Sequence, residues 1–215
     1  MEPDAVEIRV VGCLIEKQRT TPDLYPLTLN ALRLACNQST NREPVVDYDE
    51  NTIRSAIERL VQRKWVTLAS WSNRRSMKYR HTLDAALGLD DAEVSVLAVL
   101  MLRGPQTPGE LKTRTDRLHQ FGDAGVAETL DRLAGRDLVE RLERRPGQRE
   151  ERWRHLLGEE SEDERPAPSI SPPAAAPAAP AAPASTGGED RLERIERELA
   201  ELRAQVRALR DELGA

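Results

Sequence analysis

Arginine and asparagine side chains gather at three places in the N-terminal part of the sequence. They lie in ACNQSTNREPV at residues 35–45, in ENTIRSAIERLVQRK at 50–64, and in SNRRS at 72–76. An arginine fork can bind guanine or a phosphate, and an asparagine amide can pair with adenine. These side chains therefore predict contacts with double-stranded DNA. The candidate contacts are Asn41, Arg42, Asn51, Arg54, Ser55, Arg59, Asn73, Arg74, Arg75 and Lys78.

Each of these groups also has a structural interpretation. A long loop leaves many backbone groups to satisfy, and Asn and Ser side chains do this locally. We favour that bracing role for Asn37 and Gln38, whereas for Asn41 and Arg42 the sequence leaves both roles open. The remaining candidates have a solvated basic surface as their alternative. The neighbours expected in a bracing network are Glu16, Lys17 and Asn30.

Charge is distributed unevenly along the chain. The whole sequence has 32 basic and 37 acidic residues, a net charge of −5. Residues 51–82 nevertheless contain eight basic residues and a single acid, Glu58, which gives +7. Residues 158–215 contain 7 basic and 13 acidic residues, which gives −6. A polyanion is therefore expected to bind within residues 51–82.

Hydrophobic periodicity predicts the elements that position these side chains. The stretches VEIRVVGCLIEKQ (6–18), PLTLNALRLAC (26–36) and residues 50–64 have helical spacing, and Pro26 is suited to a first turn. The segments WVTLASW (65–71) and MKYRHTL (77–83) are typical of strands, joined by a basic turn. Three helices followed by a hairpin with a basic tip predict a winged helix-turn-helix.

The sequence then repeats this pattern, which predicts two tandem modules. The second copy also has a capping box from Thr107 to Glu110, with Pro108 at the first helical position. The first copy is longer between its second and third helices. The matching stretches are EVSVLAVLMLR (93–103) with EIRVVGCLIEK (7–17), LDRLAGRDLV (130–139) with IERLVQRKWV (57–66), and WRHLL (153–157) with YRHTL (79–83).

The second module is less suited to DNA than the first. Acids at Glu128, Asp131 and Asp137 interrupt its third helix and dilute Arg132 and Arg136. We expect this module to pack, to dimerise or to make secondary contacts. Its wing is basic at the tip, and the candidate secondary contacts are Arg144, Arg145 and Arg149.

The C-terminal part has a different composition. SPPAAAPAAPAAPASTGG cannot bury a core and predicts a disordered spacer. The following heptads predict a coiled coil, whose flanking charges mildly favour a parallel dimer; a single amphipathic helix packed on another surface is the alternative. Self-association is therefore an expected property. The seam residues are Leu192, Ile195, Leu199, Leu202, Val206, Leu209 and Leu213.

The predicted fold is mainly α with small β-hairpin wings (α+β), in four parts. A first winged-helix domain spans 1–89 and a second spans 90–157. A disordered Pro/Ala-rich linker covers 158–188, and a coiled-coil helix covers 189–215.

Catalysis is not expected of this chain. We find no HExxH, P-loop or GxSxG motif, and no Cys–His pair at a plausible spacing. His81 and His155 occupy equivalent repeat positions, which indicates packing, and Cys13 and Cys36 have the pattern of small core residues in a reducing cytosol. No metal, cofactor or small-molecule substrate is predicted. The absence of a long apolar run predicts a cytoplasmic protein with no membrane partner.

Residues 1–157 resemble the YceH-like family of bacterial tandem winged-helix proteins. The resemblance rests on GCLIEKQRTTPDLYPLTLNALRLACNQSTNREPV in the first module, and on LRGPQTPGELKTR and PGQREERWRHLL in the second. It implies a winged-helix fold and a DNA-binding or regulatory role. The spacer and the heptads lie outside the resemblance.

Two functions are consistent with these patterns. The first is a DNA-binding protein, a transcriptional regulator that contacts duplex DNA through the third helix and wing of its first module. The alternative is a non-enzymatic protein-interaction adaptor, because tandem winged helices also serve in chromosome-organising complexes. The +7 segment favours DNA, whereas the acidic tail and the diluted second module favour the adaptor.

Overall fold

The structure is a computed structural model that describes residues 2–69, 77–122, 125–144 and 150–158. These residues belong to one compact unit, and they form α-helices and two small antiparallel sheets. The mixed α+β class is therefore confirmed. The Pro/Ala-rich segment and the predicted coiled coil, from residue 159 onward, lie outside the described residues.

The first half contains a helical cluster and a three-stranded sheet. Sheet order is β1-β3-β2, with Leu27 opposite Tyr79 and Leu68 also opposite Tyr79. The elements are α1 (Ala5–Thr20), η1 (Pro22–Leu24), β1 (Leu27–Thr28), α2 (Leu29–Cys36), α3 (Glu50–Gln62), β2 (Val66–Ala69), β3 (Lys78–His81) and α4 (Leu83–Leu87).

Two details of the first half differ from the sequence-based prediction. The helix expected from Pro26 begins at Leu29, because the Thr28 hydroxyl accepts a hydrogen bond from the Ala31 N–H and caps it there. The residues before it pair with β3 as β1, and the short helix α4 was not predicted at all. Tertiary pairing therefore overrides the local signal of Pro26.

The second half has three helices followed by two strands, the order of α1, α2, α3, β2 and β3 in the first half. Its strands pair antiparallel with Val139 opposite His155, and Gln106 bridges Trp153 where β1 meets β3 in the first half. The predicted capping box is confirmed, since the Thr107 hydroxyl and the Glu110 carboxylate each accept a backbone N–H from the other residue. The elements are α5 (Asp91–Arg103), α6 (Pro108–Thr115), α7 (Gly125–Ala134), β4 (Val139–Leu142) and β5 (Arg152–His155).

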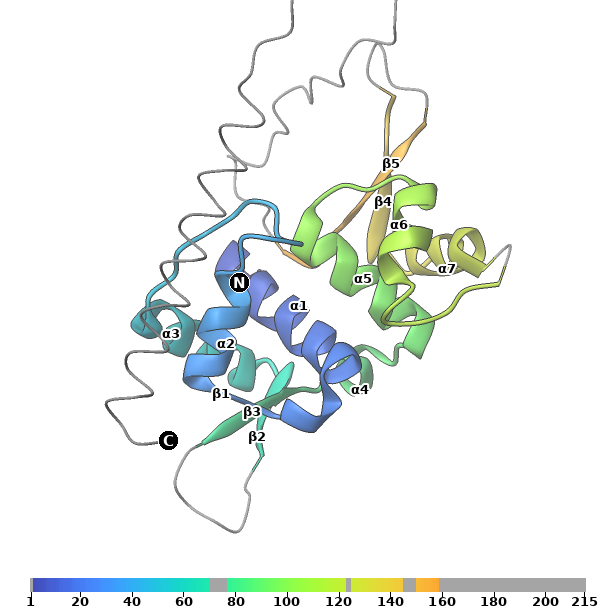
Figure 1. The fold of residues 1–215 in the computed structure, drawn as a ribbon. Helices are drawn as coiled ribbons and strands as arrows, with labels where there is room; N and C mark the ends of the chain where they lie inside the picture. The colour runs from blue at the N-terminus through green and yellow to red at the C-terminus, as the bar shows by residue number, and fades with distance from the viewer. Residues whose placement is uncertain (1, 70–76, 123–124, 145–149, 159–215) are drawn as a thin grey trace, which may run out of the picture. The chain divides into compact units, whose positions relative to one another are not determined.

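The two halves share one hydrophobic core along α1 and α5 (Figure 1). Residues 7–15 of α1 and 93–102 of α5 are buried without interruption, so each helix is covered on all sides. Gly12 is a point of close approach, because a Cβ there would lie 3.0 Å from the Leu102 side chain and 3.2 Å from Met101. The halves are therefore packed together by equivalent helices.

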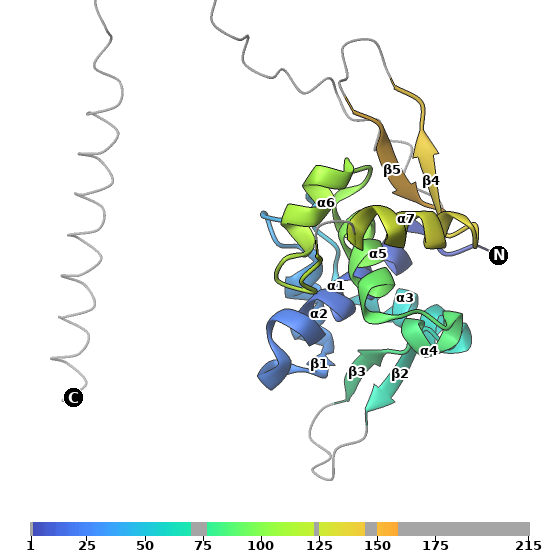
Figure 2. The ribbon, with the colours of Figure 1, turned by 90° about the vertical axis from the view of Figure 1, so that its right-hand side faces the viewer.

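The two hairpins lie at opposite ends of this unit. Figures 1 and 2 show β2 and β3 projecting at one end and β4 and β5 at the other. Cys13 and Cys36 are buried free thiols in the core. Among the described residues, no helix combines the length and the apolar character that crossing a membrane would require.

Candidate nucleic-acid interface

Helix α3 presents a polar face opposite a buried apolar stripe. Asp49 caps it by accepting the Thr52 N–H at 2.7 Å, which fixes where the helix begins. The buried stripe consists of Ile53, Ala56, Ile57 and Leu60. On the opposite face near the N-terminus, Asn51, Arg54 and Ser55 are all exposed. Three of the candidate contacts are therefore brought together on one accessible surface.

Arg54 is held by a local ion pair. Its Nη2 lies 2.6 Å from Glu50 Oε1, one helical turn away, and both side chains are about half exposed. Pairs of this kind contribute only about 0.3–0.5 kcal/mol. A phosphate or a guanine could therefore displace Glu50 at low cost, although Glu50 reduces the positive charge of the free surface.

Arg59, which the sequence predicts as a DNA contact, is half-buried and pairs with two acids of the same chain. Its guanidinium lies 2.6 Å from Asp4 and 3.2 Å from Glu7, the residues of the α1 capping box. Arg63 also pairs with Glu7, at 3.2 Å. These ion pairs indicate a structural role for Arg59, which joins α3 to the start of α1, and its contact with DNA stays a prediction.

The same arrangement recurs in the second half. Arg132 lies 2.8 Å from Asp90 and 3.3 Å from Glu93, the capping box of α5, and Arg136 lies 3.4 Å from Glu93. A contact that both copies keep is a property of the fold. Comparison of the two halves is thus the signal that could have indicated a structural role for Arg59.

The prediction for Arg42 is corrected, because its side chain is fully buried. The guanidinium is bidentate to Glu16, with Nη2–Oε2 at 2.5 Å and Nη1–Oε1 at 3.2 Å. Nε donates to the Ala35 carbonyl at 3.0 Å, and Nη2 donates to Gln38 Oε1 at 2.9 Å. Burial alone would lower the pKa of Arg42, but the Glu16 hydrogen bond and nearby negative charge outweigh it and raise that pKa. This charge cannot reach a DNA phosphate.

The rest of the loop is braced as the structural interpretation predicts. The Asn37 amide donates to the Tyr48 carbonyl at 2.8 Å and accepts the Tyr48 N–H at 2.9 Å. Gln38 accepts hydrogen bonds from Arg42 and, at 3.4 Å, from Lys17. The structural role predicted for Asn37 and Gln38 is therefore confirmed.

Asn41 is turned toward the second half of the molecule. It has a positive φ of 60°, a conformation that Asn tolerates better than most residues. Its side-chain oxygen accepts a hydrogen bond from Arg103 at the end of α5. Next to it, the Glu43 N–H donates to the Leu102 carbonyl at 2.8 Å. Asn41 therefore helps to join the halves, and its contact with DNA stays a prediction.

The hairpin adds cations beside α3. Tyr79 and His81 point into the core, so the alternating residues Lys78 and Arg80 lie on the outer side, and Arg80 is exposed. Arg80 and the exposed Lys64 were missed as candidates, although strand alternation would have identified Arg80. Asn73, Arg74 and Arg75 lie outside the described residues.

The candidate secondary contacts of the second half are described only in part. Arg144 is exposed, with its Nε 3.8 Å from Glu151. Arg145 and Arg149 lie outside the described residues. On α7 the outward residues include Glu128 and Asp131, which occupy the repeat positions of Ser55 and Glu58 of α3.

The chain thus has a mixed helix and small-sheet fold of winged-helix-like character. It belongs to the UPF0502 family: the family model "Protein of unknown function, DUF480" matches residues 4–148. The family resemblance of residues 1–157 is confirmed at this level, since YceH-like is another label for UPF0502.

Similar proteins come from several bacteria. A UPF0502 protein of Pectobacterium atrosepticum is 48% identical over 168 residues, covering 74% of this chain and 79% of the relative. One from Azotobacter vinelandii is 50% identical over 156 residues, covering 72% and 69%. One from Pseudomonas aeruginosa is 48% identical over 177 residues, covering 81% and 79%.

Proposed function

We propose that this protein binds double-stranded DNA through α3 and the β2–β3 hairpin, as a tandem winged-helix protein and a transcriptional regulator. The observation that carries the proposal is the exposed face of Asn51, Arg54 and Ser55 on α3. Amide, guanidinium and hydroxyl groups at the start of a recognition helix are the groups that read base edges.

The contrast with α7 supports the choice of the first half. The positions equivalent to Arg54 and Ser55 in the repeat are Ala127 and Glu128, so α7 lacks the guanidinium and has an exposed acid that would repel phosphates. The +7 segment does overstate the available charge, because Arg54, Arg59 and Arg63 pair with acids outside it. Of the remaining basic residues that the structure describes, Lys64 follows α3, and Lys78 and Arg80 lie on β3, where a wing would contact the backbone.

A protein-interaction adaptor is the second candidate function, and exposed apolar side chains favour it. Met77 and Leu68, on or beside the hairpin strands, are 66% and 47% exposed, and Leu24 in η1 is 69% exposed. Apolar groups at the proposed wing are better suited to a protein surface than to phosphates. An absence of salt-dependent binding to DNA would favour this second candidate.

Salt-dependent binding to random-sequence duplexes tests the proposal. The double change Arg74→Ala, Arg75→Ala should weaken binding and reduce the slope of log affinity against log salt by about one for each phosphate that is no longer neutralised. Arg132→Ala, which removes one charge from α7, is the control and should leave both quantities unchanged. Equal slopes for the wing variant and the wild type would reject the wing as a DNA-binding element.

Base reading needs a separate measurement. Arg54→Ala and Asn51→Ala should change which sequences are enriched from a pool of random duplexes, because bidentate contacts discriminate bases by about 1–3 kcal/mol each. Arg54→Lys keeps the charge but removes the fork, and it should behave like Arg54→Ala in this selection. Identical enrichment by all variants would leave α3 without a reading role.

We also propose self-association through the C-terminal heptads. Truncation after Gly158 should leave the folded unit intact and shift the mass toward monomer, measured by light scattering coupled to size exclusion. Retention of the full-length mass would move the assembly surface to the folded unit.

A further inference from the structure

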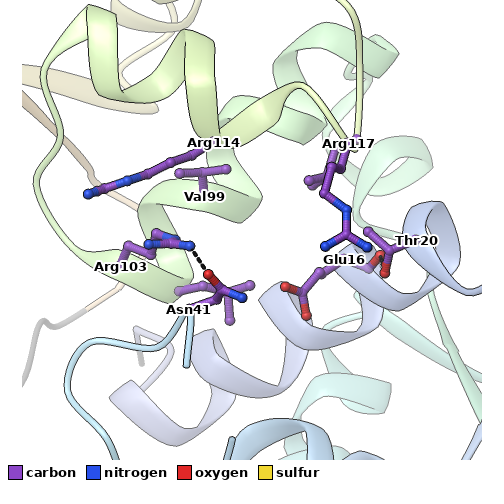
Figure 3. Close-up of a pocket in the computed structure, with 9 residues that line it drawn as sticks. Glu16, Thr20, Asn41, Val99, Arg103, Arg114 and Arg117 are labelled. Carbon is purple, nitrogen blue, oxygen red and sulfur yellow. Dashed lines mark hydrogen bonds between the residues drawn. The ribbon is translucent and has the colours of Figure 1, made fainter. Parts of the chain in front are cut away.

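A small pocket lies where the two halves meet, away from the proposed DNA-binding elements. Glu16 and Thr20 of α1 and Asn41 of the loop after α2 line it from the first half, and Arg103, Arg114 and Arg117 line it from the second. None of its lining residues belongs to α3 or to the hairpin β2–β3. Figure 3 shows the guanidinium groups of Arg103 and Arg114 on one side of the opening and that of Arg117 on the other.

The charges around this pocket do not balance. Three arginines face one acid, Glu16, and that carboxylate is already bound by Arg42 and lies 3.5 Å from Lys17. Burial would raise the pKa of Glu16, but the hydrogen bond and charge of Arg42 outweigh it and lower that pKa. Glu16 is therefore ionised and neutralised from behind, so the pocket has a net positive charge.

The three arginines lack strong partners of their own. In the described part of the chain, the Arg103 guanidinium bonds only the neutral amide of Asn41, and Arg117 makes no ion pair or side-chain hydrogen bond. Arg114 lies 3.6 Å from Glu110, which also serves Arg152 at 3.1 Å. Burial and the nearby charge of Arg114 lower the pKa of Arg103. An anion placed between these groups would relieve that repulsion.

We propose that this pocket binds a phosphate group of a small anionic ligand. Guanidinium forks match phosphate oxygens bidentately, and the Asn41 amide adds a neutral hydrogen-bonding group. The space of about 80 Å³ equals that of two to three water molecules, which suits one phosphate with the rest of the ligand outside. Because the lining comes from both halves, the bound ligand holds α1, α5 and α6 together.

Calorimetric titration of the full chain with pyrophosphate, against chloride at matched ionic strength, tests this site. Pyrophosphate should bind the wild type and raise its Tm, because a ligand that binds only the folded state stabilises it. The two variants to compare are Arg117→Gln and Arg114→Gln. Because Arg117→Gln breaks no ion pair or side-chain hydrogen bond among the described residues, weaker binding in this variant reflects a lost ligand contact and not misfolding. Each change should weaken pyrophosphate binding about tenfold. Arg33→Gln on α2, outside the pocket, is the charge-matched control and should bind like the wild type.

Three outcomes would overturn the proposal. The first is a response to pyrophosphate that is no larger than the response to chloride at the same ionic strength. The second is equal weakening by Arg33→Gln, which would indicate a diffuse charge effect. The third is weaker duplex DNA binding by Arg117→Gln with unchanged pyrophosphate affinity, which would assign these arginines to the DNA backbone. The titration contains no DNA, so its result is independent of whether α3 and the hairpin bind duplexes.

Discussion

The two halves of the molecule differ most in the connection between their second and third helices. In the first half, residues 37–49 form a loop braced by the buried Arg42–Glu16 pair and by the hydrogen bond from Glu43 to Leu102. In the second half the equivalent connection is shorter, covering residues 116–124, and Arg117 and Leu118 line the pocket there. The longer loop is used to attach one half to the other, and the shorter one leaves room for a ligand.

What the halves share is equally informative. Asp4, Glu7 and Arg59 make the same contacts as Asp90, Glu93 and Arg132, and His81 and His155 are buried at equivalent strand ends. Repeated contacts maintain the fold that both copies need. Arg54 and Arg42 are present in the first half only. Arg54 belongs to the candidate interface, and Arg42 belongs to the loop that attaches one half to the other.

The largest expected effect comes from Arg42, which has no counterpart in the second half. Arg42→Ala leaves Glu16 partly buried without its partner, and breaking such a pair costs about 3–5 kcal/mol. Unfolding in urea measures this as a lower midpoint. Arg33→Ala, on the neighbouring helix α2, should cost less than about 0.5 kcal/mol. Similar costs for the two variants would mean that the loop is not an essential brace.

The packing between halves is tested at Gly12. Gly12→Val inserts methyl groups against Leu102 and Met101, and overpacking of this kind costs about 1–3 kcal/mol. Gly109→Val places the same side chain on α6, where a Cβ would lie 4.0 Å from its nearest neighbour, and should cost less. Far-UV circular dichroism during thermal unfolding should show one transition for both halves. Two separate transitions in the wild type would contradict the shared core.

The buried histidines predict a dependence of stability on pH. Burial lowers the pKa of His81 and of His155 to about 4, from an unfolded value of 6.5. Below pH 6.5 the unfolded chain binds protons that the folded chain does not, so stability falls as the pH drops from 6.5 toward 4. At pH 5 the decrease should be about 1–2 kcal/mol for each histidine.

Single variants show whether the two histidine positions are equivalent. His81→Gln and His155→Gln should each reduce the change in unfolding free energy between pH 7.5 and pH 5 by a similar amount. A variant with the full wild-type dependence would show that its histidine binds protons equally in the folded and the unfolded chain.

The smallest expected effect on stability comes from the two arginines at equivalent positions in the halves, Arg59 and Arg132. Arg59→Gln and Arg132→Gln should each lower stability by about 0.5–1 kcal/mol, because these side chains are 38% and 46% exposed and their ion pairs are partly screened. Neither change should alter DNA affinity. A specific weakening of DNA binding in Arg59→Gln would return Arg59 to the candidate interface.

Helix periodicity and capping predicted most of the fold, because these signals are local. The apolar positions Val10, Val11, Leu14 and Ile15 are buried as expected, and the capping box at Thr107 is present. Strand β1 and helix α4 were missed, since two paired residues and one short turn leave no periodic pattern. The packing of α1 on α5 could not be predicted from these local signals, because it joins residues that are about 90 positions apart in the sequence.

The candidate site was predicted less well than the fold, because ion pairs between distant parts of the sequence decide which cations are available. Residue type and outward position identified Asn51, Arg54 and Ser55, and these are exposed on α3. The same criteria selected Arg42 and Arg59, whose partners Glu16 and Asp4 come from a distant part of the chain. Sequence spacing does not reveal whether a cation already has a partner across the fold.

The burial of α1 against α5 has a consequence for the protein during its synthesis. Translation reaches the end of α1 at Thr20, but the last residue of α5, Arg103, is added many seconds later at about 5–20 residues per second. During that interval Gly12 and its apolar neighbours have no α5 to cover them. The nascent first half therefore carries an open hydrophobic face, the kind of surface that holdase chaperones bind.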